Sequence, residues 1–504
     1  MPFELIALAP LLPLLATALV AAWHIFGAPG GDAAEARTVR LLSYAMLGSL
    51  AVLLAMDARA LLYGAPGEIV LGTWFAAGGI QIPVSFMIDA LSLPFATLIA
   101  VIGYIALKFS ANYLHRERGF HRFFIINGLF LTGMLMLVLS GNIVLSFVGW
   151  EIVGVSSYLL IGYAFERTVA TGSAVRAFVT NRIGDAGFIL AIALTLHYFD
   201  SFAWSGLGAA AISTGTVSVS LVALGFVVAA LAKSAQVPFT PWITRALEGP
   251  TPSSAIFYGS LMVHAGVYLI LRLEPVLVQA PLLLVLIAVA GLVTALYGWF
   301  GGLVQSDVKS ALLFGTLTQI GIMFVTIGFG AFDVAAWHMC LHATFRAWQF
   351  LSAPSYMHAV KGASVEVPPW LGRSQRWYTA ILERFWLERF GDALLTLPMQ
   401  DLGRDMRLFD ERIVSRMLGA PGDSEFSPHR QNRLVRGRGV AGALLEWCAA
   451  NLYRLEQHLL MGTEGGPTRR TLRALSEYLA VLESMLEQPR YLILLILIIF
   501  IAGM

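Results

Sequence analysis

Long apolar segments set the strongest limit on what this chain can fold into. A helix needs about 20 mostly apolar residues to cross the hydrocarbon core of a bilayer. Eleven segments are long enough, approximately 3–26, 40–63, 85–110, 123–140, 143–165, 176–198, 216–243, 252–272, 277–301, 303–329 and 333–358. With 58% hydrophobic and 13% charged residues, the composition favours an all-α, polytopic membrane protein over a soluble enzyme.

Changes in composition divide the sequence into four parts. Residues 1–84 hold the N-terminal transmembrane helices, and residues 85–358 form the largest apolar block. Residues 359–490 are polar and rich in arginine. Residues 491–504 form a last apolar segment, which brings the expected total to about 12 transmembrane helices.

The polar part contains two amphipathic runs, Trp377–Leu397 and Arg473–Leu486, in which apolar and charged residues alternate at helical spacing. Such helices fit a docking surface for a cytoplasmic subunit. They fit equally well a connector that lies on the membrane surface.

Positive charge in the short loops predicts the orientation, because cytoplasmic loops carry an excess of Lys and Arg. Most of these cations follow odd-numbered segments: Arg37, Arg116, Arg118, Arg122, Arg167 and Arg245. We therefore expect a multi-pass protein of the cell (inner) membrane, with a non-cytoplasmic N-terminus and residues 359–490 in the cytoplasm.

Several classes of function are disfavoured by what the sequence contains. The net charge is only +2 and no long basic run is present, so no nucleic acid partner is expected. Cys340 and Cys448 are far apart and suggest neither a disulfide framework nor a metal cluster. No nucleotide-binding loop, redox-cofactor motif or hydrolytic triad is evident, so we expect no cofactor and no catalysis by this chain alone.

The interiors of the apolar segments carry a sparse series of ionisable residues. A charged side chain at the bilayer centre costs roughly 2.5–3.5 kcal/mol on insertion scales, so such residues indicate function. The series comprises Glu151, Arg182, Asp185, Lys233, His264, Lys309, His338, His342 and Arg346. Their spread over successive helices suggests a path for protons or other ions through the membrane.

Glu151 has no cation within one helical turn, and Lys233 is its best candidate partner. Lys233 is followed by Pro238 and Pro241, which lack N–H groups and predict a broken helix. Burial favours a neutral lysine, whereas a nearby carboxylate favours the charged form, so the pair can load and release a proton. The alternative is a static buried ion pair that joins two helices.

Arg182 and Asp185 are three residues apart on one helix and can pair on one face. Because arginine does not release its proton, a structural or field-tuning role is favoured for this pair. Lys309 lies near a helix start and is a candidate for the proton path, but its side chain could also extend to the membrane interface.

His338, His342 and Arg346 recur every four residues and form one stripe on one helix. His264 lies on another helix. Histidines can pass protons along hydrogen-bonded chains, although packing histidines bonded to backbone carbonyls would give the same pattern. The His338–His342 spacing could hold zinc, but no third ligand is evident, so no metal is expected.

Four stretches resemble the antiporter-like membrane subunits of respiratory complex I and of Mrp-type cation/proton antiporters. They are FVGWEIVGVSSYLLIG (147–162), AFVTNRIGDAG (177–187), the segment Ala232–Arg272 and the segment Val304–Leu351. With flanking helices the resemblance covers roughly residues 85–358. It implies inverted repeats with broken helices and a proton path at the membrane midplane. Glu151 and Lys233 match the family's coupled pair, and Lys309 and His342 match its polar axis.

The sequence departs from this family in two places. Arg346 stands where the family usually has a lysine, and arginine cannot act as a deprotonating relay. After residue 358 the chain becomes polar where the family continues with membrane helices, so the second inverted repeat is truncated.

A core of this kind followed by a polar part resembles the DabB-type subunit of inorganic-carbon transporting complexes. That resemblance implies coupling of proton flow to CO2 or bicarbonate accumulation by a large cytoplasmic, zinc-containing, carbonic-anhydrase-like (DabA-type) partner. The alternative is a proton-pumping subunit that assembles with other membrane subunits of a complex I-like oxidoreductase or an Mrp antiporter. A third hypothesis is a non-conducting scaffold whose charges only specify the fold.

Overall fold

The computed structural model describes residues 2–25, 30–359 and 367–410, together with residues 414, 447 and 451. It divides into two compact units, Met1–Thr396 and Leu397–Met504. The second unit is described chiefly through helix α19 (Leu397–Phe409). The predicted segment 491–504, the run Arg473–Leu486 and Cys448 lie outside the described residues.

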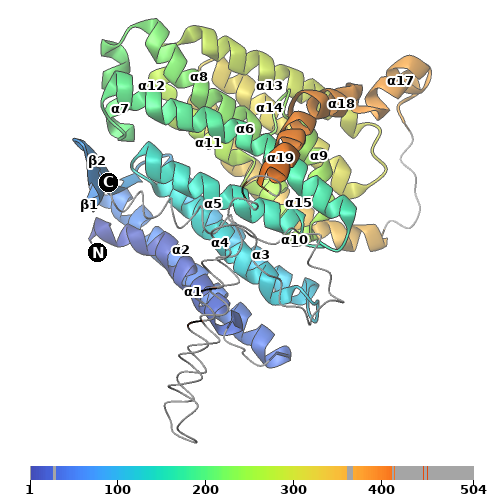
Figure 1. Ribbon diagram of the computed structural model, residues 1–504, viewed down its shortest axis with the longest axis horizontal. Coiled ribbons are helices and arrows are strands. Elements are labelled where there is room, and N and C mark those ends of the chain that lie inside the picture. Colours follow the sequence, from blue (N-terminus) through green and yellow to red (C-terminus); the bar gives the residue numbers. More distant parts are fainter. Residues whose placement is uncertain are drawn as a thin grey trace, which may run out of the picture. The chain divides into compact units, whose positions relative to one another are not determined.

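The first unit consists mainly of long helices (Figure 1). In the described part of the chain, ten helical stretches are long and apolar enough to cross a membrane. Their principal helices are α1 (Leu8–Ile25), α2 (Asp32–Tyr63), α3 (Ser92–Tyr113), α4 (Phe120–Leu139), α5 (Ile143–Ile161), α6 (Thr168–Phe199), α8 (Thr216–Lys233), α11 (His264–Arg272), α13 (Pro281–Gly302) and α14 (Val308–Gly328). The predicted polytopic, helical membrane fold is confirmed.

The eleventh predicted segment, 333–358, forms helix α15 (Phe332–Ala359). It is not among the ten apolar stretches, because polar side chains such as His338, His342 and Arg346 lower its mean hydropathy. Helix α14 begins later than predicted, since the Asp307 carboxylate caps its first turn and accepts a 2.8 Å hydrogen bond from the Ser310 amide. The inverted repeat stays a prediction.

One spanning stretch, Thr251–Arg272, is surrounded by other helices along its whole apolar length. It consists of the short helix α10 (Thr251–Ser254), a π-helical turn (Ala255–Ser260) and helix α11. It packs against α3, α8, α14 and α15. A polar side chain on this stretch, such as His264, therefore faces protein rather than lipid.

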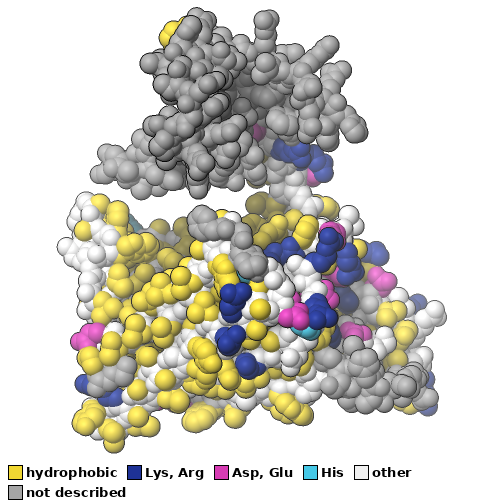
Figure 2. All heavy atoms as spheres, turned by 90° about the horizontal axis from the view of Figure 1, so that it is seen from below, with side chains coloured by type: hydrophobic (Ala, Val, Ile, Leu, Met, Phe, Trp, Pro, Cys, Tyr) yellow, Lys and Arg dark blue, Asp and Glu magenta, His cyan; other side chains and the backbone are white. Residues whose placement is uncertain are grey.

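Helix α13 is much less covered by other helices than Thr251–Arg272, and one of its faces is exposed and apolar. Its exposed residues include Leu282, Val285, Leu286, Val289 and Leu292. They recur at helical spacing, as expected of a face covered by lipid or by another apolar surface. Figure 2 shows one face of the molecule, on which hydrophobic side chains cover broad areas and charged side chains gather in a few groups.

A β-hairpin between α2 and α3 is an element that the apolar segments did not predict. Strands β1 (Gly67–Ala77) and β2 (Ile80–Ile88) pair antiparallel, and Gly78 and Gly79 form the turn between them. Both glycines have positive φ, at 58° and 84°, as a tight hairpin turn requires. The Gly-Gly pair between two β-branched, aromatic runs is the signal in the sequence that marks this hairpin.

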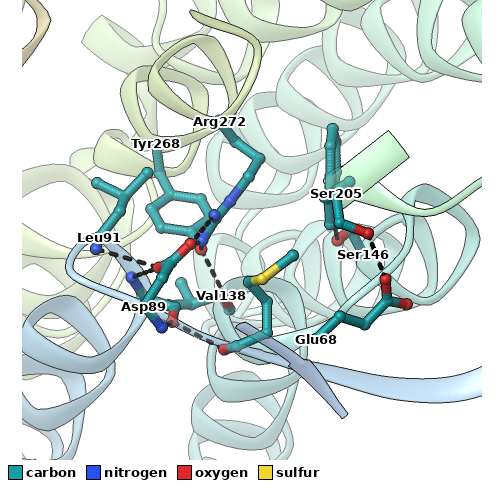
Figure 3. Close-up of polar contacts among 11 residues, drawn as sticks. Glu68, Asp89, Leu91, Val138, Ser146, Ser205, Tyr268 and Arg272 are labelled. Carbon is teal, nitrogen blue, oxygen red and sulfur yellow. Dashed lines mark hydrogen bonds and ion pairs between the residues drawn. The ribbon is translucent and has the colours of Figure 1, made fainter. Parts of the chain in front are cut away.

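The base of the hairpin is anchored to the helices through polar contacts (Figure 3). Asp89, just after β2, forms an ion pair with Arg272 at the end of α11. Arg272 also donates a 2.7 Å hydrogen bond to the Tyr268 hydroxyl, which donates to the Val138 carbonyl. Burial alone would raise the pKa of Asp89, but the hydrogen bond and charge of Arg272 hold it below its ordinary value.

The amphipathic run Trp377–Leu397 is not one helix. Helix α17 (Gln375–Leu382) ends before a turn over Arg384–Trp386, which is followed by α18 (Leu387–Gly391) and a second π-helical turn, Asp392–Thr396. A short helix, α16 (Pro369–Gly372), precedes them. The run is interrupted because residues 384–386 have positive φ, a conformation outside the helical region.

Candidate polar path through the membrane

Three helices bring together a cluster of four ionisable side chains. Arg182 on α6 forms ion pairs with Glu151 on α5 and, at 3.0 Å, with Asp185 one turn further along α6. Lys233, the last residue of α8, places its Nζ 3.9 Å from Asp185 Oδ1. Two acids and two bases therefore form one connected chain in the order Glu151, Arg182, Asp185, Lys233.

This geometry corrects the predicted pairing. Glu151 is bound directly by Arg182 and not by Lys233, because the guanidinium of Arg182 can contact two carboxylates at once. The predicted pairing of Arg182 with Asp185 is present. One carboxylate oxygen of Glu151, Oε1, is buried and has no hydrogen-bond partner among the described residues.

Lys233 is 1% exposed and is held by contacts that are individually long. Besides the 3.9 Å contact with Asp185, its Nζ lies 3.5 Å from the Trp150 carbonyl and 4.7 Å from the centroid of the Trp150 ring. The Trp150 indole donates a 2.6 Å hydrogen bond to Asp185, so it fixes the carboxylate that faces the lysine. Trp150 is a site residue that a search limited to ionisable residues missed.

Small residues make room for this cluster. A Cβ on Gly154 would lie 3.3 Å from both Arg182 Nη2 and Lys233 Nζ, so the glycine leaves space for two cations beside α5. Helices α6 and α8 meet through Gly187 and Gly225, where a Cβ on Gly225 would lie 2.6 Å from the Gly187 carbonyl oxygen. This close approach brings Asp185 within reach of Lys233.

The predicted helix break follows Lys233 directly. Helix α8 ends at Lys233, and the chain resumes helical structure only at α9 (Pro241–Arg245). The carbonyl of Ser234, which Pro238 deprives of its helical donor, accepts a 3.0 Å hydrogen bond from the Gln236 side chain. The Ala232 carbonyl accepts one of 2.9 Å from the Trp242 indole. Neighbouring side chains thus satisfy backbone groups that the break sets free.

A second polar group lies on α11 and α15. His264 Nε2 and His342 Nδ1 are 3.0 Å apart, and the Arg346 Nε donates to His342 Nε2 at 3.5 Å. His338, one turn before His342, is 3.0 Å from the side-chain oxygen of Gln319 on α14. The stripe predicted on one helix therefore does meet His264, and Gln319 is an additional polar member.

The two groups are joined at the break. The Ser234 hydroxyl donates a 2.7 Å hydrogen bond to the Val263 carbonyl, so the residues next to Lys233 and His264 are in contact. Lys309 is not brought into either group. It is half-buried, lies in the first turn of α14, and has no hydrogen bond or ion pair with the described residues.

Among the described residues, no group of three or more His, Cys, Asp or Glu side chains is placed to hold a metal ion.

The arrangement has features that suit the movement of charge. It contains titratable groups at hydrogen-bond or near hydrogen-bond separations, a lysine without a close counter-ion, and a broken helix beside it.

Two family models match parts of this chain. Residues 140–366 match a family model described as "NADH:quinone oxidoreductase/Mrp antiporter, TM". Residues 74–124 match one described as "NADH-Ubiquinone oxidoreductase (complex I), chain 5 N-terminus". All the ionisable residues of the polar path lie within the first match.

Relatives of known type agree with the family models. NAD(P)H-quinone oxidoreductase subunit 5 of the Paulinella chromatophora chromatophore is 36% identical over 71% of this chain and 54% of its own length. NADH-quinone oxidoreductase subunit L of Mycobacterium tuberculosis is 39% identical over 57% of this chain and 46% of its own. The chain spans about half the length of these curated relatives.

Solved structures share the fold. The Mrp complex of Dietzia sp. contains a chain that is 28% identical, with a TM-score of 0.61 over 71% of this chain and 38% of that one. An archaeal membrane-bound sulfane sulfur reductase contains one with a TM-score of 0.62 over 72% and 73%, at 19% identity, which shows the fold alone. Over residues 74–124 and 140–366, the chain is similar to the membrane subunits of NADH:quinone oxidoreductases and Mrp antiporters.

Proposed function

We propose that this chain is a proton-translocating subunit of a multi-subunit membrane complex of the complex I or Mrp kind. The observation that carries the proposal is the connected series of side chains from Glu151 to Lys233. The hydrogen-bonded pair His264 and His342 lies across the helix break, where the Ser234 hydroxyl is bonded to the Val263 carbonyl. The relatives reported above are NADH oxidoreductase subunits, which favours such a complex over the inorganic-carbon role.

Lys233 is the group that loads and releases the proton. Its nearest carboxylate oxygen is 3.9 Å away, so the charged lysine is only loosely paired, while the site excludes bulk water. Arg182 holds both Glu151 and Asp185. When Arg182 moves toward Glu151, Asp185 becomes free to stabilise charged Lys233; when it returns to Asp185, the lysine loses that support and releases its proton.

The next acceptors are His264 and His342, whose ring nitrogens are already at hydrogen-bond separation. Arg346 is charged beside them and cannot take part in the transfer, so it sets the field at this end of the path. His338 and Gln319 offer a branch that avoids the arginine. Lys309 has no contact that links it to the path, and its role in proton transfer stays a prediction.

Proton uptake by the assembled complex in proteoliposomes, followed with a pH-sensitive dye, tests the proposal. We expect Lys233→Ala and Glu151→Gln to lower the flux at least tenfold while the complex still assembles. Matched controls are Lys108→Ala and Glu117→Gln, which remove exposed groups of the same types and should leave the flux unchanged. Normal flux in both Lys233→Ala and Glu151→Gln would favour a non-conducting scaffold.

A second candidate is the DabB-type role in inorganic carbon accumulation. The observation that favours it is the polar, arginine-rich composition beyond residue 366, where the family model's match ends. In that role residues 359–490 would lie in the cytoplasm and bind a large zinc-containing, carbonic-anhydrase-like (DabA-type) subunit. Purification of the intact complex separates the candidates: redox or antiporter membrane subunits support the first, and a single large zinc protein supports the second.

A further inference from the structure

Residues 384–396, here called the strap, cross the broken helix and are fastened to it by Glu388. This carboxylate accepts hydrogen bonds of 2.8 and 3.2 Å from Arg245 and one of 3.0 Å from the Thr244 hydroxyl, both on α9. It also forms an ion pair with Arg384 of the strap itself. One side chain thus joins the strap to the short helix that follows the break.

A second ion pair fastens the other end of the strap. Asp392 contacts Arg176 on α6 at 2.6 Å. The same helix carries Arg182 and Asp185 further along. The strap therefore bridges α6, which carries Arg182 and Asp185, and α9, the first helix after the break that follows Lys233.

The backbone of the strap is held in a conformation that it would not adopt alone. Arg384, Phe385 and Trp386 have φ values of 52°, 54° and 53°, in the left-handed region that side chains other than glycine rarely occupy. Such residues persist where surrounding contacts over-determine them, and they cluster at clamps and switches. Here the contacts are the Glu388 ion pairs and the packing of the Phe385 ring on Tyr297 and Phe300.

A small cavity lies under the strap. Its volume is about 10 Å³, which is room for about one water molecule. Pro238 and Pro241 of the break, Thr180 of α6, and Gly391 and Thr396 of the strap line it. Thr180 is 5% exposed, so its side chain has almost no contact with solvent in this structure.

We propose that Glu388 is a positioning residue that holds the strap closed over the broken helix and so controls the access of water to the Lys233 path from that side. The proposal rests on the proposed role of Lys233 in proton transfer. When the Glu388 contacts break, the strained turn relaxes, the strap lifts, and the cavity widens, so that water reaches its inner wall at Thr180.

The strap is held closed by ion pairs of Glu388, and these pairs persist in mild acid. Burial alone would raise the pKa of Glu388, but the hydrogen bonds and charges of Arg245 and Arg384 hold it below its ordinary value. The carboxylate therefore stays ionised and paired throughout the neutral and mildly acidic range.

The test is the accessibility of a cysteine placed in the cavity, Thr180→Cys, in the full complex with Cys340 and Cys448 replaced by serine. Membrane vesicles of each orientation are treated with a membrane-impermeant thiol reagent. We expect slow labelling with native Glu388 and labelling at least fivefold faster in Glu388→Gln, from one side only. Glu388→Asp, which keeps the charge, should restore most of the protection.

The matched control is Glu383→Gln, which removes a carboxylate on the same segment that pairs at 3.6 Å with the exposed Arg389. It should label as slowly as the parent. Equal labelling in the parent and Glu388→Gln would overturn the proposal, as would equally fast labelling in Glu383→Gln.

If Glu388→Gln fails to accumulate, Arg245→Gln removes the partner of Glu388 on α9. Labelling of the cysteine should then be at least fivefold faster than in the parent, as expected for Glu388→Gln. Labelling does not depend on ion flux, so failure here is distinct from failure of the proposed function.

Discussion

The hydroxyl of Ser234 donates a 2.7 Å hydrogen bond to the carbonyl of Val263. Each of these residues is the immediate neighbour of a titratable one, Lys233 and His264. The bond therefore ties the end of α8, just after Lys233, to the residue that precedes His264.

Ser234→Ala removes this connection. The Val263 carbonyl loses a partner in a buried position, and we expect a loss of about 1–3 kcal/mol in stability. Because the end of α8 is no longer tied to the residue that precedes His264, proton flux in proteoliposomes should fall several-fold. Ser220→Ala on the same helix, where the hydroxyl has no hydrogen bond in the described structure, serves as the control. Unchanged flux in Ser234→Ala would show that the bond is structural only.

Arg182→Lys tests whether one side chain must hold two carboxylates. A lysine has a single nitrogen and cannot contact Glu151 and Asp185 in the same way. We expect about a tenfold loss of flux with the complex still assembled. Arg167→Lys, which alters an exposed pair with Glu248, should have little effect. Equal activity of Arg182→Lys and the parent would contradict the proposed switching between the carboxylates.

Gly225→Ala tests the close approach of α6 and α8. The new methyl group would overlap the Gly187 carbonyl and force the helices apart, at a cost of about 1–3 kcal/mol. The gap between Asp185 and Lys233 should widen, so flux should fall together with the thermal midpoint in detergent. At Gly215 nothing lies within 4 Å of an added Cβ, and Gly215→Ala should change neither quantity.

Asp89→Asn tests the anchor of the hairpin as a function of pH. The folded-state pKa of Asp89 lies below its ordinary value. The ionised carboxylate therefore stabilises the folded protein fully above about pH 4, and this stabilisation is lost as pH falls through the folded-state pKa. We expect Asp89→Asn to be less stable by about 2 kcal/mol, with a constant difference between pH 5 and 8 that shrinks below pH 4. A difference that changes between pH 6 and 8 would contradict this assignment.

The control for this measurement is Asp401→Asn. Asp401 pairs with Arg404 on an exposed face of α19, with both side chains more than half exposed. Such pairs contribute little, so the thermal midpoint should stay within error of the parent at every pH.

The membrane helices and most of the path could be predicted from the sequence, because charge inside an apolar segment is rare and each such residue stands out. Glu151, Lys233, His264 and His342 were found in this way, and the structure brings them into two connected groups. The pairing between different helices inside the first group could not be predicted. Three helices converge there, and sequence spacing reports only the neighbours on one helix, such as Arg182 and Asp185.

Other features could not be predicted, because the residues that mark them are neither ionisable nor part of the pattern of long apolar segments. Trp150 and Gln319 contact path residues through neutral donors and acceptors. The hairpin lies between two spanning segments and is marked only by its Gly-Gly turn. The interruption at Arg384 depends on contacts with Arg245 and Tyr297, which are distant in sequence, so helical periodicity over Trp377–Leu397 could not reveal it.

The π-helical turn Ala255–Ser260 and the turn residues 261–263 set the rotational phase of α11, which begins at His264. Residues of an α-helix advance by about 100° each, so an ordinary turn in its place would point His264 in a different direction from the one that meets His342. Insertion or deletion of one residue here would leave the composition of the helix almost unchanged. It would nevertheless turn the imidazole away from its neighbour, which makes this short stretch a place where the path can be disconnected without the loss of any charged or titratable residue.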